Sequence, residues 1–215
     1  MKNNIDKLAS QLLETLSNSP DKGRYFLGIT GCPAAGKSML ARKLTDEINF
    51  RAGGDLAVVV PMDGFHLPNS ILKERGLTKV KGAPKTFDAD SFVELINRLH
   101  EFPDQRIMCP AYDRKIHEPV ENSITIQPGN RLIIVEGNYL LLNRSPWSII
   151  RTKMNEIWYV DTPLKIVKER LLSRHIAGKA SIDEAERKLA SVDLPNAELI
   201  KKTLSFADKI VNLHN

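Results

Sequence analysis

The sequence predicts an α/β domain whose core is a five-stranded, mainly parallel sheet flanked by helices. Short apolar runs alternate along the chain with segments of helical periodicity. The runs at residues 56–60 and 132–135 are continuously apolar, as expected for parallel strands that are covered on both faces. With 215 residues, 42% of them hydrophobic and 27% charged, the chain has the size and composition of one globular domain spanning residues 1–215.

The first part of the chain predicts a helix, a strand, a loop, a second helix and a second strand. An amphipathic helix ends at the breaker Asn18-Ser19-Pro20, and its apolar face consists of Ile5, Leu8, Ala9, Leu12, Leu13 and Leu16. This face could pack on its own domain or form a homodimer contact. Residues 25–30 predict the first strand, a helix follows the glycine-rich loop at residues 31–38, and residues 56–60 predict the second strand.

The middle of the chain contains an irregular segment followed by a helix. Glycines and prolines interrupt residues 65–87, where the pattern allows one short helix at residues 71–75. Irregular segments of this length often carry function. A helix at residues 92–99, with Asp88 or Asp90 as its N-cap, completes a crossover to the sheet.

The remaining elements follow the same alternation. Short strands are predicted at residues 107–111, 124–126, 132–135 and 157–160. Thr162 and Pro163 then predict a capped helix with proline at its first position, and Ser181 with Glu184 forms the capping box of another. A helix at residues 195–204 and an edge strand at residues 208–213 end the chain.

The bulk properties exclude several classes of protein. No apolar stretch approaches the roughly 20 residues needed to cross a bilayer, and the N-terminus lacks a secretory signal. Cys32 and Cys109 form no metal-binding pattern, so we expect a reduced, cytoplasmic location. The net charge of +5 is dispersed along the chain, and the sequence shows no nucleic-acid-binding signature. Binding of a polyanionic nucleotide is a sufficient explanation for the excess of basic residues.

Residues 31–38, Gly-Cys-Pro-Ala-Ala-Gly-Lys-Ser, match the GxxxxGK[ST] phosphate-binding loop, or P-loop. Its position between a strand and a helix is the one that the chemistry requires, since backbone N–H groups and the helix N-terminus then face the phosphates. Lys37 is expected at the β- and γ-phosphates of ATP and Ser38 at Mg²⁺, whereas Cys32 is interpreted as structural. The candidate nucleotide contacts are Gly31, Ala34, Ala35, Gly36, Lys37, Ser38 and Met39.

Two carboxylates follow apolar strands at the edge of the sheet where the P-loop lies. Glu136 ends the strand at residues 132–135, where it could bind Mg²⁺ directly, act through water or contact the substrate. Asp63 follows the strand at residues 56–60 and is expected to orient an acceptor hydroxyl toward the γ-phosphate. The alternatives are an exposed strand-end carboxylate for Glu136 and a cap for Asp63.

Two further polar groups are candidates for the site. Tyr112, Arg114 and His117 form a cluster that fits either substrate recognition or a surface turn. Arg170 and Arg174 lie four residues apart on one helix face, as in a phosphate clamp, although solvated surface arginines have the same spacing.

Several motifs together resemble the phosphoribulokinase, uridine kinase and pantothenate kinase group of P-loop kinases, over nearly the whole chain. Residues 63–82 look like the substrate-side segment of bacterial type I pantothenate kinase. The combination is closer to the branch described as nucleoside/nucleotide or sugar kinase-like, and its motifs are Met62-Asp63-Gly64-Phe65-His66, Lys81-Gly82-Ala83-Pro84, Tyr112-Asp113-Arg114 and Val135-Glu136-Gly137-Asn138-Tyr139. His66, Ala83 and Asp113-Arg114 depart from the pantothenate kinase pattern.

The resemblance implies an ATP- and Mg²⁺-dependent kinase with Asp63 as its catalytic carboxylate and Arg174 on a mobile lid. We expect an acceptor-binding insertion at residues 64–87, a lid at residues 174–193, and a small hydroxylated molecule such as a nucleoside, a sugar or pantothenate as acceptor. The expected acceptor contacts are Asp63, His66, Lys81, Tyr112, Arg114, His117 and Glu136. The alternatives are a P-loop nucleotide hydrolase that acts as a switch or chaperone, and a degenerate regulatory protein, although the sequence contains no NKxD segment or metal-binding Cys/His cluster and retains Lys37, Ser38, Asp63 and Glu136.

Overall fold

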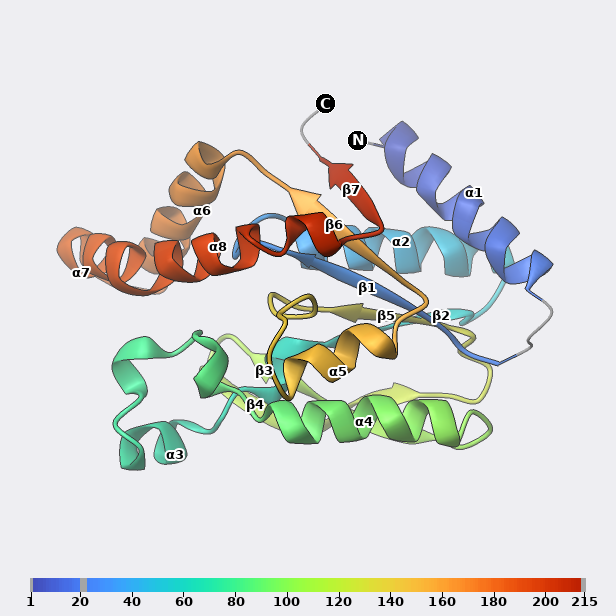
Figure 1. Ribbon diagram of the computed structural model, residues 1–215, viewed down its shortest axis with the longest axis horizontal. Helices are drawn as coiled ribbons and strands as arrows, with labels where there is room; N and C mark the ends of the chain where they lie inside the picture. Colours follow the sequence, from blue (N-terminus) through green and yellow to red (C-terminus); the bar gives the residue numbers. More distant parts are fainter. Residues whose placement is uncertain (1, 20–22, 214–215) are drawn as a thin grey trace.

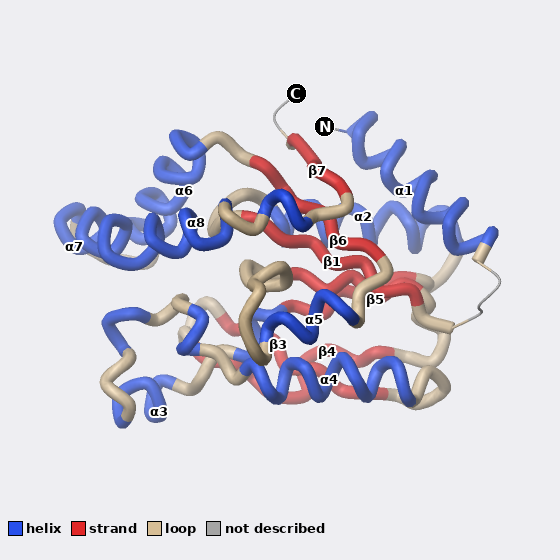
Figure 2. The backbone as a smooth tube through the Cα atoms, viewed as in Figure 1, coloured by secondary structure: helices blue, strands red, loops and turns tan. Residues whose placement is uncertain are grey.

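A parallel sheet of five strands forms the centre of the computed structural model, which describes residues 2–19 and 23–213 (Figures 1 and 2). Pro20, part of the predicted helix breaker, lies outside the described residues. The order is β2-β5-β1-β6-β7, and every neighbouring pair is parallel. The strands are β1 (Tyr25–Gly31), β2 (Ala57–Pro61), β5 (Leu132–Glu136), β6 (Glu156–Asp161) and β7 (Lys209–Asn212). The predicted fold class and the edge strand β7 are confirmed.

The two faces of the sheet are buried in separate apolar cores, which explains the continuously apolar strands. Along β5, Ile133 and Val135 belong to one core, while Leu132 and Ile134 belong to the other. Helices α1 (Lys2–Asn18) and α2 (Lys37–Ala52) cover the second core, and α4 (Ala89–Glu101) and α5 (Trp147–Thr152) cover the first (Figure 1). The apolar face of α1 therefore packs on its own domain, the first of its two predicted alternatives.

Strands β3 (Ile107–Asp113) and β4 (Glu118–Ile126) exist, but outside the parallel sheet. They form an antiparallel hairpin, so the prediction that the helix at residues 92–99 leads directly back into the sheet is wrong. The hairpin packs only one face, through Ile107, Cys109 and Ile126, into the core beneath α4. A strand pair buried on one side is typical of antiparallel structure.

Helices in the last third of the chain differ from prediction at their ends. Helix α6 (Leu164–Ala177) begins after Pro163, which is its N-cap, and Thr162 makes no cap. The capping box of α7 (Ile182–Lys188) is formed by Ser181 and Glu184 as predicted. A π-helical turn (Leu189–Asp193) joins α7 to α8 (Leu194–Lys201), and the short α5 was not predicted because six residues show too little periodicity. None of the helices within residues 2–19 and 23–213 is long and apolar enough to span a bilayer.

Two glycines bring three separate segments together at the carboxyl end of the sheet. A Cβ atom on Gly137, just after β5, would lie 2.5 Å from Cβ of Met62, in the short 3-10 helix η1 (Met62–Phe65) that follows β2. A Cβ atom on Gly64 in η1 would lie 2.3 Å from the backbone oxygen of Pro110 in β3. Only glycine allows these approaches, so η1 is held between β5 and the hairpin.

We predict that Gly64→Ala lowers the free energy of unfolding by about 1–3 kcal/mol, the usual cost of forcing extra volume into a packed site. Gly54→Ala is the matched control, because its new Cβ would meet no atom within 4 Å. Denaturant unfolding of both variants measures the effect. Equal losses in the two variants would contradict the proposed contact between η1 and the hairpin.

Candidate active site

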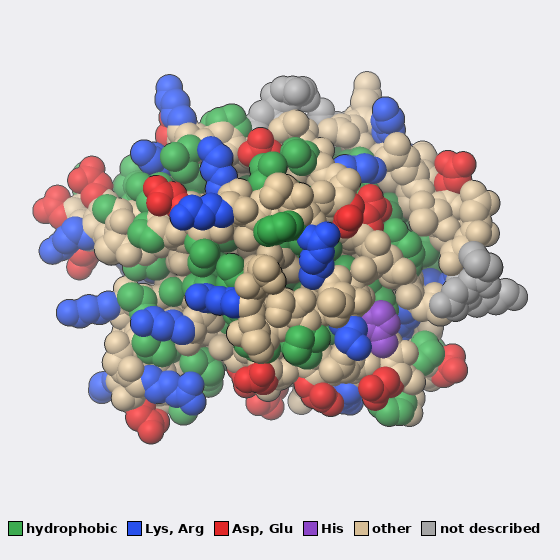
Figure 3. Space-filling model, viewed as in Figure 1, with side chains coloured by type: hydrophobic (Ala, Val, Ile, Leu, Met, Phe, Trp, Pro, Cys, Tyr) green, Lys and Arg blue, Asp and Glu red, His purple; other side chains and the backbone are tan. Residues whose placement is uncertain are grey.

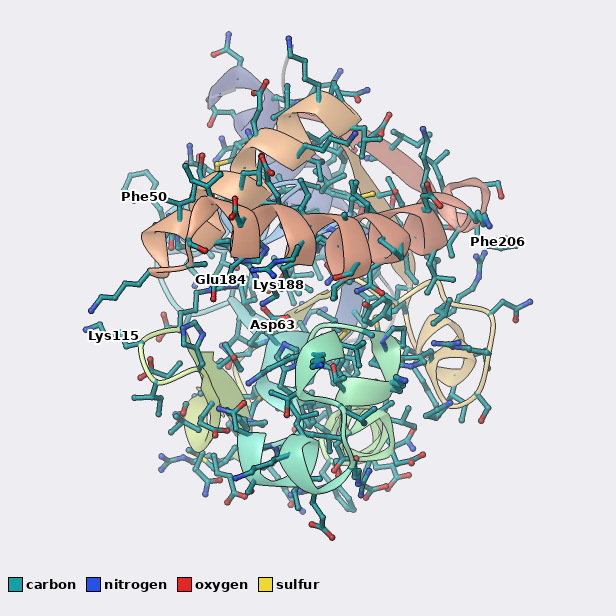
Figure 4. All side chains as sticks on the ribbon, turned by 90° about the vertical axis from the view of Figure 1, so that its left-hand side faces the viewer. Phe50, Asp63, Lys115, Glu184, Lys188 and Phe206 are labelled. Carbon is teal, nitrogen blue, oxygen red and sulfur yellow. The ribbon has the colours of Figure 1, made fainter. Side chains whose placement is uncertain are left out.

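A cavity of about 980 Å³ opens beyond the carboxyl ends of β1, β2 and β5, and most predicted site residues line it. Its walls include residues of the P-loop, of η1 and of α6. Figure 4 looks toward it, with Asp63 and Lys188 between the helices α7 and α8 above and residues of the 64–87 segment below. The predicted residues that line it are Ala34, Gly36, Lys37, Ser38, Met39, Asp63, His66, Lys81, Tyr112, Arg114, His117, Glu136, Arg170 and Arg174.

The P-loop has the backbone geometry that exposes amide groups to an anion. Ala34 and Gly36 have φ angles of 59° and 106°, and Gly36 begins α2 without a side-chain cap. The backbone oxygen of Ala35 accepts a 2.9 Å hydrogen bond from the Thr162 hydroxyl. Because the peptide group is planar and trans, the N–H of Gly36 in the same peptide points the opposite way. Gly31 and Ala35, two predicted nucleotide contacts, are buried and do not line the cavity.

Lys37 and Glu136 are buried at the floor of the cavity, and the exposed Ser38 completes a polar group with them. The Lys37 ammonium donates to the Cys32 backbone oxygen at 2.9 Å, and the Ser38 hydroxyl donates to the Glu136 carboxylate at 3.1 and 3.2 Å. Burial lowers the pKa of Lys37, against the opposing influence of Glu136 and Asp63. Burial, followed by the Asp63 charge, raises the pKa of Glu136 to about 7. Both shifts arise because charge is expensive in this enclosed place.

The Ser38 and Glu136 oxygens fit a magnesium ion that is held mainly by phosphates. A hydroxyl and a carboxylate stand side by side next to the P-loop, and such oxygen donors suit Mg²⁺. Among residues 2–19 and 23–213 there is no group of three or more His, Cys, Asp or Glu that would hold a metal by itself. A site of two protein ligands matches the way Mg²⁺ is usually bound together with a nucleotide.

Asp63 lies opposite this group, and the hairpin supplies its partner. One carboxylate oxygen of Asp63, Oδ2, accepts a 3.2 Å hydrogen bond from Arg114, which also forms a salt bridge with it. Arg114 stands at the tip of the hairpin, where Tyr112 and His117 also line the cavity. The cluster that sequence alone could not distinguish from a surface turn thus lies in the same cavity as Asp63.

The two ends of the segment at residues 64–87 pair with each other through His66 and Phe87. The His66 ring lies against both Phe87 and the hairpin. His66 forms an antiparallel bridge with Phe87, and their rings stack with centroids 3.9 Å apart. The Tyr112 ring lies 4.8 Å from the His66 ring. Burial lowers the pKa of His66 to about 4, which keeps the imidazole neutral near pH 7. Within the segment lie α3 (Asn69–Glu74) and the 3-10 helices η2 (Thr78–Val80) and η3 (Pro84–Thr86).

Residues 174–193 form the opposite wall, and a small apolar cluster ties this wall to the P-loop. The cluster contains Val167, Leu171 and Leu189, with Cys32 and Ala34 of the P-loop packed against it. The two ends of residues 174–193 are joined by a 2.6 Å hydrogen bond between Nε2 of His175 and the Asp193 carboxylate.

Arg170 and Arg174, the predicted clamp, both reach the cavity but have different surroundings. The Arg170 guanidinium donates to the Ala34 backbone oxygen at 3.2 Å, so it supports the P-loop. Desolvation and then the Arg114 charge lower the pKa of Arg174, whereas Asp63 raises it. Arg174 therefore faces the acidic and basic groups at the centre of the cavity.

Sequence reasoning missed several residues that belong to the site. Thr162 was interpreted as a helix cap, yet it anchors the P-loop, and its place directly after a parallel strand was the available signal. Asn69, Asn138, Lys188 and Asn196 also line the cavity. Asn69 and Asn138 lie in stretches that carry the family resemblance but were not chosen as site residues, whereas no sequence motif marks Lys188 and Asn196.

The sequence matches the Phosphoribulokinase / Uridine kinase family over residues 26–213. A Schizosaccharomyces pombe protein named "Putative uridine kinase C227.14" is 32% identical over 215 aligned residues, which cover 96% of this chain and 89% of the relative. The "ATP-dependent kinase-like protein notR'" of Aspergillus versicolor is 38% identical over 66% of this chain and 87% of its own.

The crystal structure of a "putative fructose transport system kinase" from Silicibacter sp. TM1040 is similar in fold and in sequence. It superimposes with a TM-score of 0.87 at 32% identity and covers 96% of this chain and 98% of its own. The family match extends over nearly all the elements described above, from β1 to β7. This chain belongs to the phosphoribulokinase/uridine kinase family of P-loop kinases, whose members' names support an ATP-dependent kinase activity.

Proposed function

We propose that this protein transfers the γ-phosphoryl group of ATP to a hydroxyl group of a small metabolite, the acceptor. The observation that carries the proposal is the meeting of Lys37, Asp63 and Glu136 in one cavity at the carboxyl ends of three parallel strands. Ligands bind at this edge in open α/β sheets. The similar proteins include one named "Putative uridine kinase C227.14" and one named "putative fructose transport system kinase", and both uridine and fructose offer hydroxyl groups.

The nucleotide would bind at the P-loop, and the surrounding residues support that assignment. Lys37 and the N–H groups at the start of α2 supply positive charge to the phosphates, and Arg170 fixes the loop by its backbone. Ser38 and Glu136 would hold Mg²⁺. When bound, the ion neutralises phosphate charge as it shifts toward the leaving oxygen. We assign Glu136 to the metal rather than to the acceptor because its carboxylate already bonds Ser38.

Asp63 would receive the acceptor hydroxyl. Arg114 occupies its Oδ2 atom, which leaves Oδ1 for the hydroxyl. The carboxylate orients the hydroxyl and takes its proton as the new bond to phosphorus forms, and orientation is the larger part because the transition state is loose. Arg174 would face the transferred group from the other wall.

The acceptor would bind between residues 64–87, the hairpin tip and residues 174–193, which act as a lid. His66, Lys81, Tyr112 and His117 line this part of the cavity. Closure of the lid would exclude water, so that the hydroxyl rather than solvent attacks the phosphate.

We predict that Asp63→Asn lowers kcat by about 100-fold or more, the range of general base catalysis, and leaves the KM for ATP unchanged. Asp55→Asn is the matched control, since Asp55 precedes β2 at the opposite end of the sheet. The measurement is ADP release from ATP and Mg²⁺ over a panel of nucleosides, sugars and pantothenate. Acceptor-independent hydrolysis that ignores Asp63→Asn would favour a nucleotide-driven switch instead.

We predict that Lys37→Ala abolishes transfer, because the Lys37 ammonium, buried beside the P-loop backbone, is the cation that would bind the β- and γ-phosphates. Binding of a fluorescent ATP analogue and turnover of the best acceptor should be measured together. Lys201→Ala, at the exposed end of α8, serves as the control. Full turnover by Lys37→Ala would contradict the proposed role of the P-loop lysine in phosphoryl transfer.

We predict that His66 makes a contribution to stability that is lost as the pH falls from 6.5 to 4. The pKa of His66 is about 4 in the fold and about 6.5 in an unfolded chain, so between these values the unfolded state binds the extra proton. Thermal midpoints of the wild type and of His66→Phe, measured from pH 4.5 to 7, test this. The variant keeps a ring against Phe87 but cannot titrate, so its midpoint should fall less; parallel curves would contradict the buried neutral imidazole.

A further inference from the structure

The cavity carries more cationic than acidic side chains, and most of them already have a partner or a role. Lys37 and Arg170 contact the P-loop, Arg114 pairs with Asp63, and Asp193 pairs with His175. Arg174 faces Asp63 across the cavity. Figure 3 shows Lys and Arg side chains over this side of the molecule, between α7 and α3. The remaining two cations in the lining are Lys81 and Lys188.

Lys81 is held in position by neutral groups only. Its ammonium donates to the Asn69 side-chain oxygen at 2.6 Å and to the His117 backbone oxygen at 2.7 Å, and it lies 5.3 Å from the centre of the Tyr112 ring. Two hydrogen bonds leave one of the three ammonium donors for a ligand. Glu118, the nearest carboxylate acting on Lys81, accepts hydrogen bonds from the Asn69 backbone N–H instead.

The hairpin tip is shaped to hold Lys81. His117 has a φ of 55°, a conformation that residues other than glycine rarely adopt. In this conformation its backbone oxygen accepts from both Asn69 and Lys81. The position of the Lys81 ammonium is therefore fixed by two chain segments, residues 64–87 and the hairpin, as in a preorganised binding site.

Lys188 approaches from the opposite wall. It is the last residue of α7, its side chain is exposed, and within residues 2–19 and 23–213 its ammonium makes no hydrogen bond or ion pair. Lys188 and Asp63 line the same cavity, and both are labelled in Figure 4. Lys81 and Lys188 line the same cavity. Burial lowers the pKa of Lys81; Glu118 opposes this shift, and the Lys188 charge adds to it to a smaller extent. Like charges that face each other across a cleft favour an anion between them.

We propose that Lys81 and Lys188 together bind a negatively charged group of the acceptor, a phosphate or a carboxylate, at a distance from the hydroxyl that faces Asp63. This inference rests on the proposed function and specifies the acceptor class, an anionic hydroxylated metabolite. Because Lys81 belongs to the acceptor-binding segment and Lys188 to the lid, the anion connects the two walls of the cavity. A neutral acceptor would lack this connection and leave the lysines in mutual repulsion.

A binding experiment tests the site without knowledge of the acceptor. The protein is first saturated with Mg²⁺ and a non-hydrolysable ATP analogue, so that the P-loop is filled, and is then titrated with orthophosphate or acetate in a calorimeter. We expect Lys81→Gln and Lys188→Gln each to weaken binding of the preferred anion by roughly tenfold or more, since hydrogen bonds to charged groups contribute about 1.5–3 kcal/mol. The stronger of the two titrations identifies phosphate or carboxylate as the group.

Matched variants control this experiment. Lys188→Arg keeps the charge and should keep most of the affinity, and Lys115→Gln removes the same charge from a side chain outside the cavity lining, which in Figure 4 points away from the cavity. Absence of anion binding to the loaded wild type, or equal losses in Lys188→Gln and Lys115→Gln, would overturn the inference.

Turnover separates this inference from the proposed function. Matched pairs are compared: fructose with fructose 6-phosphate, ribose with ribose 5-phosphate, and glycerol with glycerate. We expect ADP release to be stimulated by charged members, with kcat/KM for them reduced about tenfold in Lys188→Gln. Stimulation by neutral acceptors alone, dependent on Asp63 but not on Lys81 or Lys188, would refute the anion site and retain the kinase. Failure of the wild-type protein to bind the ATP analogue would refute the proposed kinase activity itself.

Discussion

The burial of Lys37 and Glu136 at one end of the sheet is the constraint on which the site depends. Both side chains are almost inaccessible to solvent. Burial lowers the pKa of Lys37 and raises the pKa of Glu136, so in each case it favours the neutral form. In water, solvent dipoles would stabilise both charges, whereas their burial costs desolvation free energy. A bound nucleotide and metal reverse this situation, because phosphate charge favours the ammonium and the metal favours the carboxylate. The floor of the cavity therefore favours charged ligands.

Close backbone approaches, rather than many side-chain contacts, bring the other residues to this floor. Gly137 lets Met62 pack directly behind Glu136, and Gly64 lets the hairpin lie against η1. Asp63 stands between these two glycine contacts, so its carboxylate is placed by rigid neighbours on both sides. Positioning of this kind matters for phosphoryl transfer, in which little covalent chemistry falls to the protein.

The parts of the site that could be predicted from the sequence are those set by the parallel sheet. Lys37, Asp63 and Glu136 each follow an apolar strand, and parallel strands bring their carboxyl ends to one edge, so local patterns sufficed. Thr162 and Lys188 were not predicted because their roles arise from contacts between distant segments. The hairpin was misplaced for the same reason: short apolar runs show that a strand exists but not which sheet it joins.

Two kinds of structure therefore meet in the cavity, and they place different demands on the sequence. The proposed nucleotide side is built on strand ends and the start of α2, where a change in any part would disturb the sheet. The proposed acceptor side is built on residues 64–87, the hairpin tip and residues 174–193, and the first two of these contact each other through polar groups such as those around Lys81. Charge on this side can change without altering the sheet, and so one scaffold can keep its phosphoryl transfer chemistry while the acceptor differs. If the proposed anion site is correct, the Lys81 and Lys188 pair is one place where acceptor choice would be set.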